Sequence, residues 1–225
     1  SIERTKKYAK FKTSQGKSAA GLMIVAPFYN KPTQEHMVRH FTEVSQSVPD
    51  TPICLYNVPG RTGVNILPAT LTKIAAQNKN VVAIKEAAGS MHAFVEMQNA
   101  LTKKGISSVK LISGDDATFA TSLVCGGDGV ISVTTHIIPK AMVNMYKAAK
   151  NNHFEELKDL HLKTYCINQG VFSVPNPVGV KYMLSKLGVC ENILRAPLYR
   201  AEEKEALFLD SILQELKNNH ISLLG

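Results

Sequence analysis

The sequence predicts a parallel α/β fold that continues into a helical carboxyl-terminal part. Short apolar runs alternate with amphipathic stretches over residues 1–150, which is the pattern of strands joined by crossover helices. The apolar runs are rich in Val and Ile, as expected for strands that a parallel sheet buries on both faces. Only helical patterns follow over 151–225, and no linker rich in Pro, Gly or Ser separates the two parts. We therefore expect an α/β unit over 1–150 with a helical extension over 151–225.

Each expected strand is followed by a stretch with apolar residues at helical spacing. The strands are expected at 22–25, 53–56, 81–85, 109–112 and 129–133. The first two of these helices are expected to begin at about Thr33 and about Pro68. The third is expected around Phe94 to Leu101, the fourth ends at about Val124, and the fifth covers 141–149. Residues 1–20 also read as a helix, and the helices of the extension are expected over 154–167, 177–187 and 202–216.

Size and composition are those of a soluble globular protein. The chain has 225 residues, of which 44% are hydrophobic and 20% charged, and no apolar run is long enough to span a bilayer. The first residues lack the apolar segment of a secretory signal. The four cysteines lie far apart without a CxxC pair, which favours free thiols in a reducing compartment. We expect a cytoplasmic protein without a membrane partner.

The formal net charge of +8 raises the question of a nucleic-acid partner. Lys and Arg are scattered, however, and their densest cluster, between Arg4 and Lys17, has no interleaved aromatic residues for a base-stacking surface apart from Tyr8 and Phe11. A solvated helical face explains the cluster better than nucleic-acid binding. His36 and His40 have the spacing of metal ligands on a helix, but no third ligand is evident nearby beyond Glu35 and Glu43. No nucleic acid and no metal are expected.

Lys85 is the most informative residue, because it stands at the carboxyl end of the apolar run that begins at Val81. Desolvation at such a place favours the neutral amine, and a neutral amine is a nucleophile that forms an imine with a carbonyl substrate. The alternative interpretation is a lysine whose stem follows the strand and whose charged head reaches water.

Further polar residues follow other strands of the predicted sheet. Tyr29 comes after the first strand, Tyr56 ends the second, and Arg61 lies in the turn after it. Because the carboxyl ends of parallel strands face one opening, these side chains are expected near Lys85. An amine nucleophile, phenols for proton transfer and a guanidinium for a carboxylate form a coherent set for carbonyl chemistry.

Each of these residues also has a purely structural interpretation. Tyr29 and Tyr56 could be core aromatics with hydrogen-bonded hydroxyls, and Arg61 could be an ordinary loop residue. Asp115 and Asp116 follow the fourth strand and are expected to cap the next helix rather than to act in catalysis.

Five motifs together decide between these interpretations. They are APFYNKPTQE at 26–35, YNVPGRTG at 56–63, AIKEA at 83–87, SGDD at 113–116 and GVISV at 129–133. In their order and spacing the chain resembles the dihydrodipicolinate synthase family of the pyruvate-dependent class I aldolases. The resemblance covers nearly the whole chain.

The resemblance implies a lyase that joins pyruvate to L-aspartate 4-semialdehyde and gives 4-hydroxy-tetrahydrodipicolinate, in lysine and diaminopimelate biosynthesis. Lys85 would form the imine with pyruvate, so no separate cofactor is expected. Tyr56 would relay protons. Tyr29 matches a tyrosine that reaches into the site of a neighbouring subunit, which implies a homodimer or homotetramer.

The resemblance also implies substrate-binding residues. Arg61 would hold a substrate carboxylate, and its presence separates this branch from the sialic-acid lyases, which lack an arginine there. Gly114 and Ile131 would help to line the pyruvate pocket.

The family fold is a (β/α)8 TIM barrel with extra carboxyl-terminal helices, and only its last five strands are visible in this sequence. The first three βα units, with a Gly-Thr-Thr segment of the family's site, are not found. We therefore expect a fragment of a longer chain. Two alternatives stay open: a related pyruvate aldolase with another acceptor aldehyde, and a catalytically inactive truncated fragment.

Overall fold

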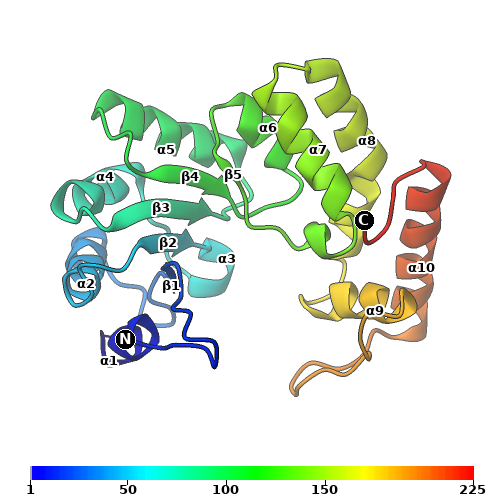
Figure 1. The fold of residues 1–225 in the computed structure, drawn as a ribbon, viewed down its shortest axis with the longest axis horizontal. Coiled ribbons are helices and arrows are strands. Elements are labelled where there is room, and N and C mark those ends of the chain that lie inside the picture. The colour runs from blue at the N-terminus through cyan, green and yellow to red at the C-terminus, as the bar shows by residue number, and fades with distance from the viewer. Residues whose placement is uncertain (1) are drawn as a thin grey trace. The chain divides into compact units, whose positions relative to one another are not determined.

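A five-stranded parallel sheet organises the first part of the protein. The computed structural model describes residues 2–225. The strands are β1 (Leu22–Val25), β2 (Ile53–Asn57), β3 (Val81–Glu86), β4 (Lys110–Ser113) and β5 (Gly129–Val130). They lie side by side in chain order, β1-β2-β3-β4-β5, and all neighbours are parallel. The predicted parallel α/β class is confirmed (Figure 1).

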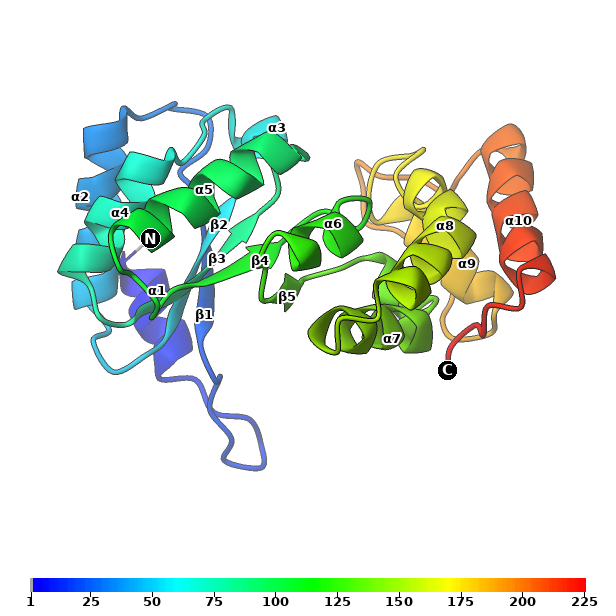
Figure 2. The same ribbon diagram turned by 90° about the horizontal axis from the view of Figure 1, so that it is seen from above.

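Helices cover one face of this sheet. The helices of this part are α1 (Ile2–Ala9), α2 (Gln34–Gln46), α3 (Pro59–Thr62), α4 (Pro68–Gln77) and α5 (Met91–Lys103). Figures 1 and 2 show α2, α4 and α5 along the same face of the strands. The core between them is built mainly from buried apolar side chains, with Phe41, Leu71 and Phe94 from the helices and Leu55 and Ile84 from the strands.

Local chemistry explains where the helices begin. The Thr33 hydroxyl accepts a hydrogen bond from the backbone N–H of His36 at the start of α2, and Ser90 does the same for Ala93 at the start of α5. These are ordinary amino-terminal caps. Helices α3 and α4 begin with Pro59 and Pro68, because proline suits the first turn, where its missing N–H is no loss.

Side chains of a strand alternate between the two faces of the sheet, and this alternation separates core from site. Leu55 and Ile84 point to the face that the helices cover, and both are completely buried. Tyr56 and Lys85, one residue further along, point to the opposite face and are half-buried. The chemistry-bearing residues therefore lie on the face that α2, α4 and α5 leave uncovered.

The second part of the protein is helical. It consists of α6 (Phe119–Val124), a short 3₁₀ helix (Thr134–His136), α7 (Pro139–Lys150), α8 (Phe154–Gly170), α9 (Val178–Lys186) and α10 (Glu203–Asn218). Buried residues such as Ile167, Met183 and Leu209 form its core. Gly170 lets α10 approach α8 closely, since a Cβ there would lie 3.1 Å from the Ile212 side chain. The helices expected for the extension are confirmed.

By their packing, the described residues form two compact units. One contains the residues up to Thr118 and Cys125–Ile131, and the other contains Phe119–Val124 and Ser132–Gly225. The boundary predicted at residue 150, which follows the end of the strand-helix alternation, stays a prediction. None of the helices within residues 2–225 combines the length and the apolar character that crossing a bilayer requires.

Two expectations about elements are wrong. The fifth strand was expected over 129–133, but it ends at Val130, because the Ser132 hydroxyl accepts from the Thr135 N–H and turns the backbone into the 3₁₀ helix. Residues 1–20 are not one helix, since α1 ends at Ala9. A tight turn follows, in which Gly16 has a φ of +75° and the backbone pairs through a Lys12–Ser18 bridge.

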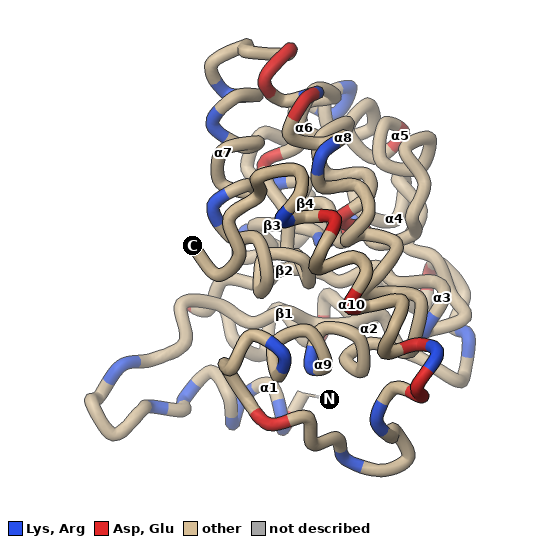
Figure 3. The backbone as a smooth tube through the Cα atoms, turned by 90° about the vertical axis from the view of Figure 1, so that its right-hand side faces the viewer, with Lys and Arg blue, Asp and Glu red and all other residues tan. Residues whose placement is uncertain are grey.

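Charged residues are spread over many elements, as Figure 3 shows. The basic residues of the amino-terminal region fall on α1 and on the turn after it, as exposed side chains; they are Arg4, Lys6, Lys7, Lys10, Lys12 and Lys17. A solvated surface accounts for them, in agreement with the sequence-based interpretation.

Candidate active site

The sheet brings Lys85 and Tyr56 together. Residues 56 and 85 are direct neighbours in the register of β2 and β3. The Lys85 amine lies over the Tyr56 ring, with Nζ 4.4 Å from the ring centroid. At this distance the ring attracts a cationic amine and also fixes the direction of the side chain. The juxtaposition expected from the two strand ends is therefore present.

Gly114 lies against the Lys85 side chain, immediately after β4. A Cβ at position 114 would lie 2.8 Å from Lys85 Cε and 2.5 Å from the Ala87 Cβ, both too close. The Gly114 N–H also donates to the Glu86 backbone oxygen at 2.7 Å. Glycine is therefore required at this position by close approach, which gives its expected place beside Lys85 a physical reason.

The surroundings of Lys85 favour its neutral form. Burial is the main cause that lowers the pKa of the Lys85 amine. The charge of buried Asp116 and the thiol of Cys54 act in the opposite direction, and the nearby Arg61 guanidinium lowers the pKa further. A larger share of the amine is therefore unprotonated, and nucleophilic, than in a lysine exposed to water.

The pKa of the Tyr56 hydroxyl is shifted upward, opposite to that of the Lys85 amine. Burial raises the pKa of its hydroxyl, and the positive charge of Arg61 offsets only part of that effect. The phenol therefore stays protonated near neutral pH and can donate a proton to an atom held between it and Lys85.

A short helix presents Arg61. In α3 the Thr62 hydroxyl donates to the Val58 backbone oxygen, and the helix ends at Gly63, which has a φ of +73°. Arg61 itself is exposed at the surface of this turn. Its guanidinium acts electrostatically on both Tyr56 and Lys85, so an anionic group bound there would lie close to the amine.

A buried polar pair behind the site was not recognised in the sequence. Asn57 and Glu86 directly follow Tyr56 and Lys85, point to the helix-covered face, and are 0% and 4% exposed. Asn57 Nδ2 donates to Glu86 Oε2 at 2.7 Å. A signal in the sequence could have indicated this pair. Each of the two strands ends with two consecutive polar residues, and by alternation the second of them falls on the core face.

Cys54 is a second residue that sequence reasoning did not place in the site. It lies two positions before Tyr56 on the same face of β2, and it is half-buried. Burial raises the pKa of its thiol, while the charge of Lys85 lowers it in part. The thiol is one of the free thiols found at all four cysteines.

The other residues singled out in the sequence differ in how far the structure buries them. Ile131 lies one residue beyond the end of β5 and is 37% exposed. Its N–H donates to the Ser113 backbone oxygen at 2.9 Å. Tyr29 is 90% exposed, so its own unit does not enclose it. Asp115 accepts from the Ala117 N–H at 3.0 Å, within a turn that precedes α6, and Asp116 is buried.

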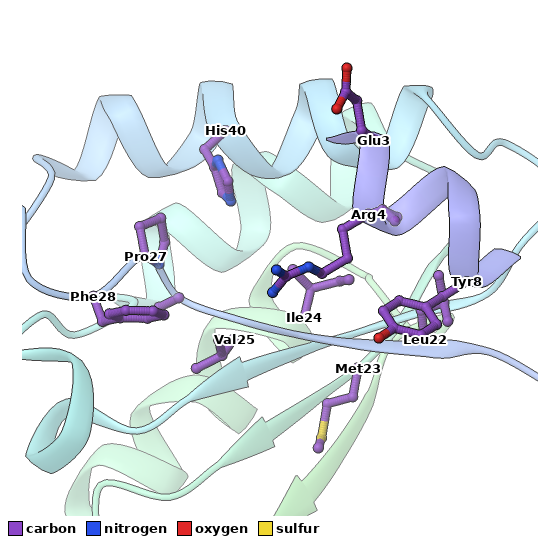
Figure 4. Close-up of a pocket in the computed structure, with 12 residues that line it drawn as sticks. Glu3, Arg4, Tyr8, Leu22, Met23, Ile24, Val25, Pro27, Phe28 and His40 are labelled. Carbon is purple, nitrogen blue, oxygen red and sulfur yellow. The ribbon is translucent and has the colours of Figure 1, made fainter. Parts of the chain in front are cut away.

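A separate hollow of about 710 Å³ lies along β1, and none of the expected site residues lines it. Arg4 and Tyr8 of α1 and His40 of α2 reach toward it, above Ile24 and Val25 of the strand (Figure 4). His40 thus faces this hollow, and burial lowers the pKa of its imidazole. The hollow is a feature of the outer edge of the sheet, distinct from the Lys85 site.

Comparison with known proteins identifies the family. The model of the dihydrodipicolinate synthetase family matches residues 4–216, which include β1 to β5 and nearly all of the helical unit. This chain belongs to that family. The resemblance of the five sequence motifs is therefore confirmed, and the chain is a member of an enzyme family.

Individual members of the dihydrodipicolinate synthetase family show how far the likeness extends. The 4-hydroxy-tetrahydrodipicolinate synthase of Thermotoga neapolitana is 41% identical over 215 residues, which are 96% of this chain and 72% of that protein. The crystal structure of dihydrodipicolinate synthase from Thermotoga maritima matches with a TM-score of 0.89 at 40% identity, over 96% of this chain and 72% of that one. The five-stranded sheet is thus part of the family's TIM-barrel fold.

A third relative is known in a ligand-bound form. It is the chloride-inhibited dihydrodipicolinate synthase from Acinetobacter baumannii, solved in complex with pyruvate. It is 33% identical to this chain, with a TM-score of 0.82, and the match covers 88% of this chain and 66% of that one.

Proposed function

We propose that this protein condenses pyruvate with L-aspartate 4-semialdehyde through an imine on Lys85, and so forms 4-hydroxy-tetrahydrodipicolinate. The observation that carries the proposal is the Lys85 amine, half-buried, with a lowered pKa, and held 4.4 Å from the centroid of the Tyr56 ring. A relative with 33% identity binds pyruvate, which supports the choice of the first substrate.

The chemistry starts with attack of the neutral Lys85 amine on the ketone carbon of pyruvate. The resulting carbinolamine loses water when Tyr56 donates a proton to the departing hydroxyl, and an imine forms. Loss of a proton from the methyl carbon gives an enamine, whose carbon attacks the aldehyde of the second substrate. The amino group of that substrate then displaces Lys85 as the ring closes, which regenerates the free amine.

Two further residues complete the proposal for substrate binding. Arg61 holds the carboxylate of the semialdehyde, for which an exposed guanidinium near the amine is suited. Gly114 lets the Lys85 side chain lie directly against the end of β4, and together with Ile131 it would line the pyruvate pocket.

The assembly forms the last part of the proposal. Tyr29 is 90% exposed in its own chain and would act in the site of a neighbouring copy, in a homodimer or homotetramer. We place the reaction in the cytoplasm, in lysine and diaminopimelate biosynthesis.

Borohydride reduction in the presence of pyruvate, followed by peptide mass spectrometry, tests the central step. We expect a reduced pyruvate adduct on Lys85 and none in Lys85→Ala, whereas Lys73→Ala, an exposed lysine of α4, should trap as the original chain does. A folded chain without any adduct would contradict the proposal and favour an inactive fragment.

A panel of aldehydes tests the acceptor once the adduct is found. Turnover with aspartate semialdehyde supports the proposed reaction. Turnover with a sugar aldehyde instead would favour a related pyruvate aldolase.

A further inference from the structure

We propose that Glu86 and Asn57 are positioning residues that hold Lys85 and Tyr56 in their reactive arrangement from the opposite face of the sheet. This inference rests on the function proposed above, because it concerns the geometry of the same amine. Neither residue contacts the space where a substrate would bind, since both point into the helix-covered core.

The pair is a closed hydrogen-bonded unit. Asn57 Nδ2 donates to Glu86 Oε2 and to Asn65 Oδ1, both at 2.7 Å, and Asn57 Oδ1 accepts from the Ile66 N–H at 2.9 Å. The second carboxylate oxygen of Glu86, Oε1, accepts from the Ala88 N–H at 2.7 Å. Four short bonds thus converge on two buried side chains.

Backbone bonds connect this unit to the chemistry. The Ala87 N–H donates to the Asn57 backbone oxygen at 2.9 Å, and the Gly114 N–H donates to the Glu86 backbone oxygen at 2.7 Å. The carboxyl ends of β2, β3 and β4 are therefore joined at the level of the amine. Asn65 and Ile66 belong to the segment that follows α3, so the same bonds hold the chain that presents Arg61.

The energetic situation of Glu86 argues against a merely tolerated polar residue. Burial raises the pKa of the carboxyl, and the bonds from Asn57 and the Ala88 N–H offset that effect only in part. A carboxylate here is therefore costly, and an apolar side chain of similar size would avoid the cost. What an apolar residue would lose is the directional connection between the two strand ends.

The design of the test uses the polarity of the bond between the two side chains. In Glu86→Gln an amide NH₂ group replaces one of the two acceptor oxygens. This new donor then faces another donor, either Asn57 Nδ2 or the Ala88 N–H. In Asn57→Asp two carboxylates face each other. In the double variant, Glu86→Gln with Asn57→Asp, the amide at position 86 donates to the carboxylate at position 57. The Asn65 amide turns so that its Nδ2 donates where its Oδ1 accepted, and both bonds of position 57 are restored with reversed direction.

The first measurement needs no substrate. Reductive methylation with ¹³C-formaldehyde places labelled methyl groups on the lysine amines, and the signal absent from Lys85→Arg is that of Lys85. Because Nζ lies over the Tyr56 ring, this signal should show an upfield ring-current shift in the original chain. We expect both single variants to lose at least about half of the shift, and the double variant to recover it.

The second measurement is the rate of pyruvate trapping by borohydride. We expect the single variants to trap about tenfold to a hundredfold more slowly, as for a misplaced reacting group, and the double variant to recover most of the rate. Glu96→Gln, an exposed glutamate of α5, is the matched control and should leave both measurements unchanged.

Each outcome is decisive. A full ring-current shift and a full trapping rate in Glu86→Gln would overturn the inference, as would a folded double variant that recovers neither. If the single variants do not fold, the double variant alone is measured. Recovery of the ring-current shift and of the trapping rate then supports the inference, and failure to recover either overturns it. If the original chain never traps pyruvate but its ring-current shift depends on Glu86, the positioning role is supported and the proposed function is rejected.

Discussion

At the scale of single residues, the site depends on where a lysine is placed relative to water. Lys85 shares its strand with Ile84, which is completely buried, and its own side chain is half-buried on the other face. This position desolvates the amine while leaving it accessible to a small molecule. An identical lysine on an exposed helix would have the same chemistry but a smaller neutral fraction.

The pH dependence of Lys85 follows from the direction of its pKa shift. Because burial lowers the pKa, the rate of Lys85 methylation should rise with pH through a midpoint below 10.5, the ordinary value for lysine. Between the folded-state pKa and that of the unfolded chain, the unfolded chain binds more protons, so stability should rise with pH. Mass spectrometry of labelled peptides across pH measures the midpoint, and a midpoint at or above 10.5 would contradict the shift.

Gly114 gives a second prediction for a single residue. In Gly114→Ala the new methyl group would collide with Ala87 and Lys85, and we expect a loss of about 1–3 kcal/mol in the free energy of unfolding. Pyruvate trapping at Lys85 should fall about tenfold or more, because the amine is displaced. Gly60→Ala is the control, since a Cβ there meets nothing within 4 Å. Equal trapping by the two variants would show that Gly114 is not needed for close approach.

At the scale of elements, the sheet depends on loops that fix where strands enter it. Asn80 precedes β3 and donates from Nδ2 to three backbone oxygens, those of Ser45, Val48 and Thr51. Its Oδ1 also accepts from the Ser45 hydroxyl at 2.6 Å. One side chain thus ties the end of α2 and the entry to β2 onto the start of β3.

Removal of this connection should be costly. We expect Asn80→Ala to lower the free energy of unfolding by about 1–3 kcal/mol, because several carbonyl groups lose their donor. Asn99→Ala, at an exposed position on α5, should change it by less than about 0.5 kcal/mol. Urea unfolding of the two variants side by side measures the difference, and similar midpoints would mean that water replaces the Asn80 side chain without loss.

At the scale of the whole molecule, Tyr29 is the residue on which the proposed assembly depends. It is 90% exposed and has a φ of +71°, a backbone conformation that costs free energy in residues other than glycine. A strained segment that presents an aromatic ring to water is reasonable if a second copy of the chain uses that ring. The proposed assembly supplies this use.

Mixing of inactive chains tests the assembly. We expect the Lys85→Ala variant to be inactive and the Tyr29→Phe variant to have little activity. Both variants should still form the dimer. In a mixed dimer, one site would combine an intact Lys85 with an intact Tyr29 from the other copy. Random mixing of equal amounts makes about half of the dimers mixed, and one of the two sites in each mixed dimer is intact. The mixture should therefore recover about a quarter of the original turnover per site. If Tyr29→Phe alone is inactive, absence of any recovery, with mixed dimers shown by mass spectrometry, would mean that Tyr29 acts within its own chain.

Much of this fold could be predicted because its signals are local. The apolar runs at 22–25, 53–56 and 81–85 became strands within about one residue of the expected ends. The segment after residue 130 could not be predicted in this way. Its Val and Ile content suits a strand, but the local bond from Thr135 to the Ser132 hydroxyl competes successfully with pairing.

The sequence by itself determined the α/β class, the family and the position of Lys85 at a strand end, since periodicity and motif spacing are properties of the chain alone. Only the tertiary structure decided that Lys85 lies over Tyr56, that Gly114 must be small, and that Asn57 bonds to Glu86 behind them. The physical reason is strand register. The pairing of residue 56 with 85 and of 57 with 86 is fixed by the packing of helices and strands far apart in the chain, and no local pattern encodes it.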